Sequence, residues 1–102
     1  MSLTNTHFLS DVDTTALIDI CRQHNVTWIG VFGSVARGEA QPHSDIDLLA
    51  RFGTPRSLIA VITLEQELTA VLGRQVDLLT EAALSPYMRD RVLHDLQVLY
   101  EA

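Results

Sequence analysis

Apolar residues recur along the chain with two different periods, and these periods alternate. Leu17, Cys21 and His24 share one face of a helix predicted over residues 13–25, for which Asp13 is a suitable N-cap. The other apolar runs predict, in order, a strand over Val26–Phe32, a short helix over Ser34–Glu39, a strand over Asp45–Phe52, a helix over Arg56–Leu72, a strand over Gln75–Leu79, a helix over Pro86–Leu96 and an edge strand over Val98–Tyr100.

Turn and capping residues separate these elements. A turn is predicted over 41–44 before the second strand, Gly73 is a C-cap for the long helix, and Ser85 with Pro86 forms an N-cap and N1 pair. The long-helix residues predicted to face inward are Val61, Leu64, Leu68 and Val71.

The order of elements predicts an α/β (α+β) fold built on a small mixed sheet. Gly33 and Ser34 end the first strand, whereas Asp45 and Asp47 begin the second, so these groups meet only if the two strands are antiparallel. A helix joins the second and third strands, which are therefore expected to be parallel through a right-handed crossover. We expect the helices on one face of the sheet and a single domain spanning residues 1–102.

Three aspartates interrupt strands that are otherwise apolar. Asp45 and Asp47 stand two positions apart, so their side chains point the same way, about 6.6 Å apart along the strand. Asp77 lies inside the third strand, and parallel pairing with the second strand brings it level with the first two acids. Asp is disfavoured in strands, so three such positions indicate a functional cause.

Carboxylates gathered on one patch of sheet repel each other unless a cation neutralises them. Mg²⁺ typically binds one or two carboxylates together with substrate phosphates, so the pattern indicates phosphoryl or nucleotidyl transfer. Asp77 would share the metal or help to deprotonate an incoming hydroxyl. Two other interpretations stay open: Asp45 and Asp47 as solvated acids, and Asp77 in a buried ion pair with Arg74, Arg51 or another guanidinium.

The Gly-Ser turn after the first strand suits a phosphate. Gly33 permits close approach of backbone N–H groups, and Ser34 adds a hydroxyl donor. The alternative is that Ser34 only caps the short helix. Arg37 either reaches a phosphate oxygen or forms a structural ion pair across the loop. The role of Glu39 stays open, and His43 either contacts substrate or lies in a surface turn. The last-helix residues Tyr87, Arg89 and Arg91 are expected on a partner-facing or solvated surface.

Composition limits the classes of substrate and the cellular compartment that we expect. A net charge of −6 and a pI near 4.9 disfavour a nucleic-acid substrate. All 7 cations are Arg, so there is no P-loop lysine. Cys21, the lone cysteine, falls on an apolar helix face, which favours core packing. A lone thiol, no signal-like N-terminus and no run of about 18 apolar residues predict a cytoplasmic protein without a membrane anchor.

The motif as a whole resembles that of a known superfamily. Ten residues separate Gly33-Ser34 from Asp45-x-Asp47, as in the signature of the DNA polymerase beta-type nucleotidyltransferases. The longer runs Phe-Gly-Ser-Val-Ala-Arg-Gly-Glu and Ser-Asp-Ile-Asp-Leu-Leu resemble its smallest branch, the minimal nucleotidyltransferases (MNT). The resemblance extends over almost the whole chain, including the strand Arg-Gln-Val-Asp-Leu-Leu and the helix Pro-Tyr-Met-Arg-Asp-Arg-Val-Leu.

The resemblance implies a site, a nucleotide and a partner. Gly33 and Ser34 would hold the phosphates of ATP, Asp45 and Asp47 would bind two Mg²⁺ ions, and Asp77 would complete the site. Two metals about 4 Å apart would clamp the attacking oxygen, the α-phosphate and the leaving pyrophosphate. Minimal members commonly act as antitoxins of HEPN-domain ribonuclease toxins, in some cases by transferring AMP from ATP to a toxin tyrosine. The motif itself shows no departure from the family pattern.

Two other functions stay open. One is a binding module that neutralises its partner by complex formation, with a site that no longer transfers a nucleotide. The other is transfer to a small molecule such as an aminoglycoside, which would need an oligomer or a partner to complete the pocket. The edge strand predicted over 98–100 suits self-association and partner binding equally.

Overall fold

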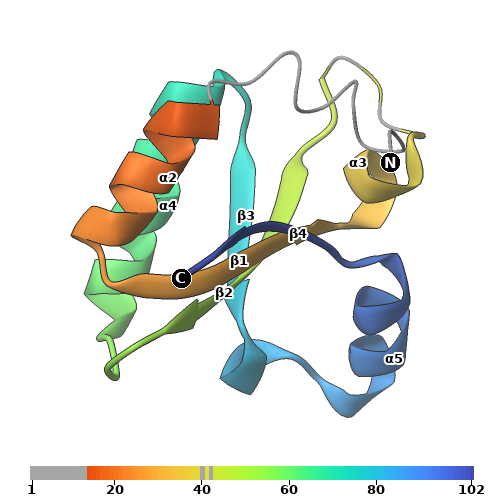
Figure 1. Cartoon of the computed structure of the whole chain (residues 1–102). Coiled ribbons are helices and arrows are strands. Elements are labelled where there is room, and N and C mark those ends of the chain that lie inside the picture. Colours follow the sequence, from red (N-terminus) through yellow and green to blue (C-terminus); the bar gives the residue numbers. More distant parts are fainter. Residues whose placement is uncertain (1–13, 40, 42) are drawn as a thin grey trace.

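Helices and strands alternate along the chain, as the sequence predicts. The computed structural model describes residues 14–39, 41 and 43–102; the predicted N-cap Asp13 and the turn residue Pro42 lie outside them. The elements, coloured along the chain in Figure 1, are α2 (Thr14–Gln23), β1 (Val26–Phe32), α3 (Gly33–Arg37), β2 (Ile46–Phe52), α4 (Leu58–Leu72), β3 (Val76–Thr80), the 3-10 helix η1 (Glu81–Ala83), α5 (Pro86–Asp95) and β4 (Gln97–Glu101).

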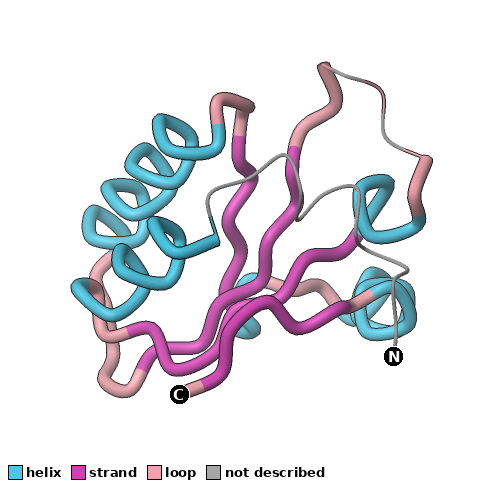
Figure 2. The backbone as a smooth tube through the Cα atoms, turned by 45° about the horizontal axis from the view of Figure 1, so that its top comes forward, coloured by secondary structure: helices cyan, strands magenta, loops and turns pink. Residues whose placement is uncertain are grey.

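The strands of the described residues form one mixed sheet in the order β3-β2-β1-β4 (Figure 2). β1 is antiparallel to both β2 and β4, and β2 is parallel to β3. These orientations confirm the predicted pairing, with α4 as the crossover between the two parallel strands. β4 lies at the edge of the sheet as predicted, and it is longer than the predicted 98–100.

Because strand side chains alternate between the two faces of the sheet, each face carries its own apolar cluster. The larger cluster, which α2 and α4 cover, includes Leu17, Cys21, Ile29, Val31, Ile46, Leu48, Leu64, Leu68, Val76 and Leu78. The smaller cluster consists of Trp28, Phe32, Leu49 and Val92, with Leu79, Leu84 and Leu96 packed against it.

The second cluster corrects the prediction that the helices pack on one face. That prediction holds for α2 and α4, whereas α5 lies across the sheet from them (Figure 1) and contributes Val92 to the opposite face. The physical reason lies in β1, where Trp28 and Phe32 point away from α2 and α4 and need an apolar cover of their own.

The long helix begins later than predicted and turns a different residue inward. α4 starts at Leu58 because the Ser57 hydroxyl accepts a hydrogen bond from the Ala60 N–H at 3.1 Å and caps it. Gly73 is the C-cap, as predicted, with φ 70°. Val71 is 37% exposed, so its inward placement is wrong, and Leu72 is buried in its place. Leu72 stands four residues after Leu68 and continues the inward stripe.

Other limits shift by one or two residues. α3 spans Gly33–Arg37 rather than 34–39, because Gly38 adopts φ 74° and its N–H bonds back to the last turn. The predicted turn before β2 is confirmed by a 3.0 Å hydrogen bond from the Ser44 N–H to the Gln41 carbonyl. α5 ends at Asp95, and η1 was not predicted. No helix of the described residues is long and apolar enough to span a bilayer.

The outer edge of β3 is covered by side chains of α4. The Val76 N–H donates to Thr69 Oγ1 at 3.1 Å, and the Leu78 N–H donates to Glu65 Oε2 at 2.8 Å. These bonds satisfy backbone groups that an open edge strand would present to solvent. They also hold the Glu65 carboxylate beside β3.

Two leucines of α4 provide a matched test of where the stability lies. We expect Leu68→Ala to lower the free energy of unfolding by about 2–5 kcal/mol, because this fully buried side chain leaves a cavity. Leu58→Ala removes the same atoms from a side chain that is 74% exposed, and should cost less than about 0.5 kcal/mol. Urea denaturation measures both, and equal losses would contradict the described core.

Candidate active site

Two of the predicted acids face each other across neighbouring strands. Asp47 of β2 is paired in register with Asp77 of β3, and paired residues of adjacent strands lie about 4.8 Å apart in the hydrogen-bonding direction. Their strand neighbours Ile46, Leu48 and Val76 point into the larger cluster, so the two carboxylates point to the opposite face of the sheet. The predicted alignment of the third acid is confirmed.

Asp45 lies just before β2 and is exposed. Its negative charge acts on both Asp47 and Asp77, so the three groups are electrostatic neighbours. We refer to Asp45, Asp47 and Asp77 as the acid cluster. The position of the cluster at the start of the two parallel strands follows from the register that the cores of β2 and β3 impose.

Gly33 lies directly against the acid cluster. The last residue of β1, Phe32, is paired with Asp47, and α3 begins at the next residue. Gly33 has φ 75°, and a Cβ atom added to it would collide with Oδ2 of Asp47. Only glycine therefore combines this backbone conformation with this approach of a carboxylate.

Ser34 is the second residue of α3 rather than its N-cap. Phe32 occupies the N-cap position, and no side chain caps the helix. The alternative that Ser34 only caps the helix is therefore wrong. Within the described residues the hydroxyl of Ser34 forms no hydrogen bond, so it remains a free donor next to Gly33 and the acid cluster.

Arg37 forms the structural ion pair that the sequence left as one of two alternatives. Its Nε lies 3.1 Å from Glu39 Oε1, and its NH1 lies 2.6 Å from Asp95 Oδ2. The Asp95 side chain is only 8% exposed, whereas that of Glu39 is 65% exposed. The guanidinium still acts on the acid cluster, because its charge lowers the pKa of Asp47.

Burial and like charges raise the pKa of two acids. The pKa of Asp47 lies above the usual Asp value because of burial first, and then because of the charges of Asp77 and Asp45; Arg37 opposes these effects. The pKa of Asp77 is raised by burial, and then by Asp45 and Glu65. Glu65 is therefore a fourth acid near the cluster, which sequence reasoning missed because it lies on a helix.

The two arginines that were candidate partners of Asp77 have other partners. Arg74 donates to the Ser44 carbonyl from NH2 at 2.6 Å and from Nε at 3.2 Å. Arg51 pairs with Glu81 and lies 4.9 Å from the Trp28 ring centroid. The predicted alternative of a buried Asp77 ion pair is therefore wrong. Arg74 instead ties the turn before Asp45 to the start of β3, a role that the sequence did not indicate.

Residues whose roles the sequence left open lie on the surface. Tyr87 is 96% exposed on α5, where Arg89 and Arg91 are exposed as well. His43 is exposed in the turn before β2, and Glu39 is exposed beside Arg37. The first four lie at the surface, as predicted, whereas Glu39 is part of the Arg37 ion-pair network.

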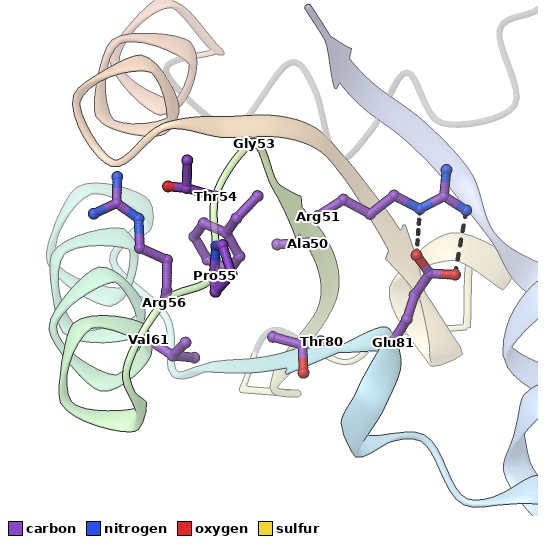
Figure 3. Close-up of a pocket in the computed structure, with 10 residues that line it drawn as sticks. Ala50, Arg51, Gly53, Thr54, Pro55, Arg56, Val61, Thr80 and Glu81 are labelled. Atoms are coloured by element: carbon purple, nitrogen blue, oxygen red, sulfur yellow. Dashed lines mark hydrogen bonds and ion pairs between the residues drawn. The ribbon is translucent and has the colours of Figure 1, made fainter.

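A hollow in the described part of the chain lies away from the acids. It encloses about 510 Å³ at the far end of β2, beyond the Arg51–Glu81 ion pair drawn in Figure 3. Its lining residues are Ala50, Arg51, Phe52, Gly53, Thr54, Pro55, Arg56, Val61, Thr80 and Glu81. The acid cluster stands at the start of β2, so the two features are separate.

The acid cluster fits a hard cation that takes part of its ligands from a substrate. Among the described residues, no three Asp, Glu, His or Cys side chains are arranged to hold a metal ion on their own. Yet Asp47 and Asp77 repel each other, and neither forms an ion pair with a described Arg or His. Mg²⁺ usually binds through one or two carboxylates, with water and phosphate oxygens completing the shell.

Comparison with known proteins identifies the family. The profile described as "Polymerase beta, Nucleotidyltransferase" matches residues 15–102. The chain is 42% identical over 79 residues to "Putative protein adenylyltransferase MJ0435" of Methanocaldococcus jannaschii, covering 78% of this chain and 85% of that protein. It is 40% identical over 78 residues to protein adenylyltransferase MntA of Thermococcus cleftensis, covering 76% and 79% of the two chains.

A solved structure shares the same fold. The crystal structure of a toxin-antitoxin complex with AMP-PNP contains a chain that matches with a TM-score of 0.76 at 25% identity, over 89% of this chain and 75% of that one. The fold is thus that of a nucleotidyltransferase. The chain belongs to the polymerase beta-type nucleotidyltransferase family, in its minimal branch, which confirms the family predicted from the sequence.

Gly33 and Gly38 allow the contact with Asp47 to be tested by a matched pair. Both have φ near +75°, where an Ala costs roughly 1–2 kcal/mol. A Cβ at Gly38 meets nothing within 4 Å, whereas at Gly33 it collides with Asp47. We expect Gly33→Ala to lower the free energy of unfolding by more than Gly38→Ala, measured by urea denaturation. Adding Asp47→Ala to Gly33→Ala should recover the difference, and equal losses in the two single variants would rule out the contact.

The raised pKa values predict how stability depends on pH. A raised carboxyl pKa means that the folded protein binds a proton more tightly than the unfolded chain. The free energy of unfolding therefore falls as pH rises from the ordinary Asp range through the raised pKa, and the full penalty persists above it. Asp77→Asn removes one such acid and one charge that acts on Asp47.

We expect Asp77→Asn to be more stable than the wild type at pH 7 in EDTA, with a gain that shrinks toward about pH 3.5. Carboxyl NMR titration should show a lower Asp47 pKa in the variant. Asp19→Asn, at an exposed position on α2, is the control and should show no such pH-dependent gain. A gain that is the same at both pH values would contradict the repulsion.

Proposed function

We propose that this chain transfers AMP from ATP, with Mg²⁺, to a tyrosine hydroxyl of a HEPN-type ribonuclease toxin and so acts as its antitoxin. The observation that carries the proposal is the pairing of Asp47 with Asp77 beside Gly33, with no cationic side chain of the described residues bound to either acid. Two neighbouring carboxylates without a cation lower the stability of the folded protein. The arrangement suits a substrate that brings a metal ion and phosphates.

In this proposal the acid cluster holds the metal. Asp45 and Asp47 would be carboxylate ligands and Asp77 would complete the site, with phosphate oxygens filling the rest of the coordination shell. When bound, Mg²⁺ would neutralise the charge of the attacked and leaving phosphate groups. The repulsion that raises the pKa of Asp47 would then become attraction to the cation.

The turn after β1 would hold the nucleotide phosphates. Gly33 leaves room for a close approach, the Ser34 hydroxyl is a donor without a partner among the described residues, and Arg37 keeps N–H groups beyond those bound to Glu39 and Asp95. All three stand on α3 or at its start, next to the acid cluster. An Arg that is already held in place loses little further freedom when it binds a phosphate.

The transfer step is a displacement at phosphorus. The acceptor hydroxyl oxygen forms a bond to the α-phosphorus, the bond from this phosphorus to the oxygen bridging to the β-phosphate breaks, and pyrophosphate leaves with that electron pair. The proton of the acceptor hydroxyl passes to Asp77. This carboxylate is exposed, so an acceptor hydroxyl can approach it.

Relatives support a protein as the acceptor. One is a protein adenylyltransferase, and the matched chain of a solved structure belongs to a toxin-antitoxin complex with AMP-PNP. The described part of this chain has no additional helical domain that would close a pocket around a small acceptor. An acceptor that brings its own surface therefore suits it better than an aminoglycoside.

Mass spectrometry tests the proposal directly. The chain, the protein encoded beside it, ATP and Mg²⁺ are incubated together, and we expect the neighbour to gain one or more AMP units on tyrosine. The double variant Asp45→Asn/Asp47→Asn should reduce the rate by at least about 100-fold, because it removes groups that organise transition-state charge. Asp19→Asn, on α2, serves as the control with unchanged transfer.

The same variants separate the proposal from its alternatives. An unmodified neighbour, together with suppression of its toxicity by the double variant in cells, would show a binding module in place of an enzyme. An unmodified neighbour and nucleotide transfer to an aminoglycoside would show a small-molecule transferase.

A further inference from the structure

The junction between α5 and β4 forms hydrogen bonds to α3, the short helix that begins with Gly33 and Ser34. Asp95, the last residue of α5, accepts a 2.6 Å bond from Arg37 NH1, and Gln97, the first residue of β4, donates from Nε2 to the Ala36 carbonyl at 2.8 Å. The two contacts fall on consecutive residues of α3. Both partners lie about 60 residues further along the chain, at separations of 58 and 61.

A helix of five residues needs such contacts to hold its place. α3 spans only Gly33–Arg37, which is too short to be stable by itself in water. Its inner residues Val35 and Ala36 are buried, but its outer end is exposed and ends in Arg37. The direction of the Arg37 side chain therefore depends on its partners rather than on the helix.

The sequence of β1 makes room for this junction. A Cβ atom added to Gly30 would lie 2.9 Å from Leu96 Cδ1 and 3.1 Å from the Gln97 carbonyl oxygen. Leu96 in turn packs on the cluster of Trp28 and Phe32. The two residues that follow Asp95 are thus packed against β1, and the Asp95 side chain is only 8% exposed.

The two acids that bind Arg37 are not equivalent. Glu39 lies two residues away, is 65% exposed and belongs to a surface ion pair of the kind that contributes little. Asp95 is nearly buried and makes the shorter bond, so the charge-assisted contact with it restricts the guanidinium. Arg37 stands on α3, and the first residue of that helix, Gly33, lies directly against the Asp47 carboxylate.

We propose that Asp95 is a positioning residue, which holds the Arg37 guanidinium beside the acid cluster so that its free N–H groups bind the phosphates of the nucleotide. The inference rests on the proposed nucleotide site but not on the identity of the acceptor. It assigns to the end of α5 a part in nucleotide binding, although Asp95 itself touches no substrate.

Nucleotide affinity in a double-mutant cycle tests the proposal. ATP with Mg²⁺ is titrated calorimetrically into the full chain without acceptor, for the wild type, Asp95→Asn, Arg37→Ala and the combination of the two. We expect Asp95→Asn to weaken ATP binding about tenfold, the size of one charge-assisted hydrogen bond. In the Arg37→Ala background the same change should have no further effect, because the two residues act as one unit.

Two controls exclude a merely structural effect. Glu39→Gln removes the exposed partner of the same guanidinium and should leave ATP affinity within about twofold. Adenosine, which lacks phosphates, should bind equally well to the wild type and to Asp95→Asn. If circular dichroism shows that Asp95→Asn has lost its fold, Asp95→Ser replaces it in the cycle.

The outcomes separate this inference from the proposed function. Unchanged ATP affinity in Asp95→Asn, an equal loss in the Arg37→Ala background, or an equal loss of adenosine binding would overturn it. Coupled loss of ATP affinity without any AMP transfer to the neighbouring protein would support it and overturn the proposed transfer. A wild-type chain that binds no ATP would overturn both.

Discussion

The carboxylates of Asp47 and Asp77 repel each other, and the rest of the structure must hold them side by side against this repulsion. The two side chains are paired across β2 and β3 without a cationic partner among the described residues, and Asp47 is partly removed from water. A sheet keeps such a pair only if its register is fixed by other forces. Those forces are the apolar side chains that alternate with the acids and bury themselves under α4.

The two faces of the sheet differ in what they carry. The larger cluster beneath α2 and α4 fixes the alignment of β2 with β3, and Glu65 and Thr69 of α4 also cover the outer edge of β3. The opposite face carries the acids and the smaller cluster, on which α5 rests. Stability and chemistry therefore depend on different sides of the same strands, so acids could be placed on one side without interrupting the main core.

Close packing of the backbone completes the site. Gly33 brings the start of α3 against the Asp47 carboxylate, and Gly30 lets the junction of α5 and β4 pack against β1. Through that junction, Asp95 reaches Arg37 on α3. Ser34, the guanidinium of Arg37 and the acids thus belong to one region of the fold, although they come from distant parts of the chain.

Much of this patch was predictable from local pattern. Alternation along a strand put Asp45 and Asp47 on one side, and the helical crossover brought Asp77 level with them, because strand periodicity and connection handedness are local rules. The predicted helix limits were wrong near Ser57 and Gly38. The Ser57 hydroxyl cap decides the first turn of α4, and the left-handed Gly38 decides the last turn of α3. The choice between Val71 and Leu72 depended on the orientation of α4, since both fit a helical stripe.

The sequence by itself determined the order of the elements, the pairing of the strands and the acids that meet, because these follow from periodicity and connection length. Only the tertiary structure decided which charges pair. Arg51 and Arg74 were equal candidates for Asp77, yet they bind Glu81 and the Ser44 carbonyl, and Arg37 binds Asp95. The direction of a long side chain depends on packing between segments that are remote in sequence, and no local period encodes it.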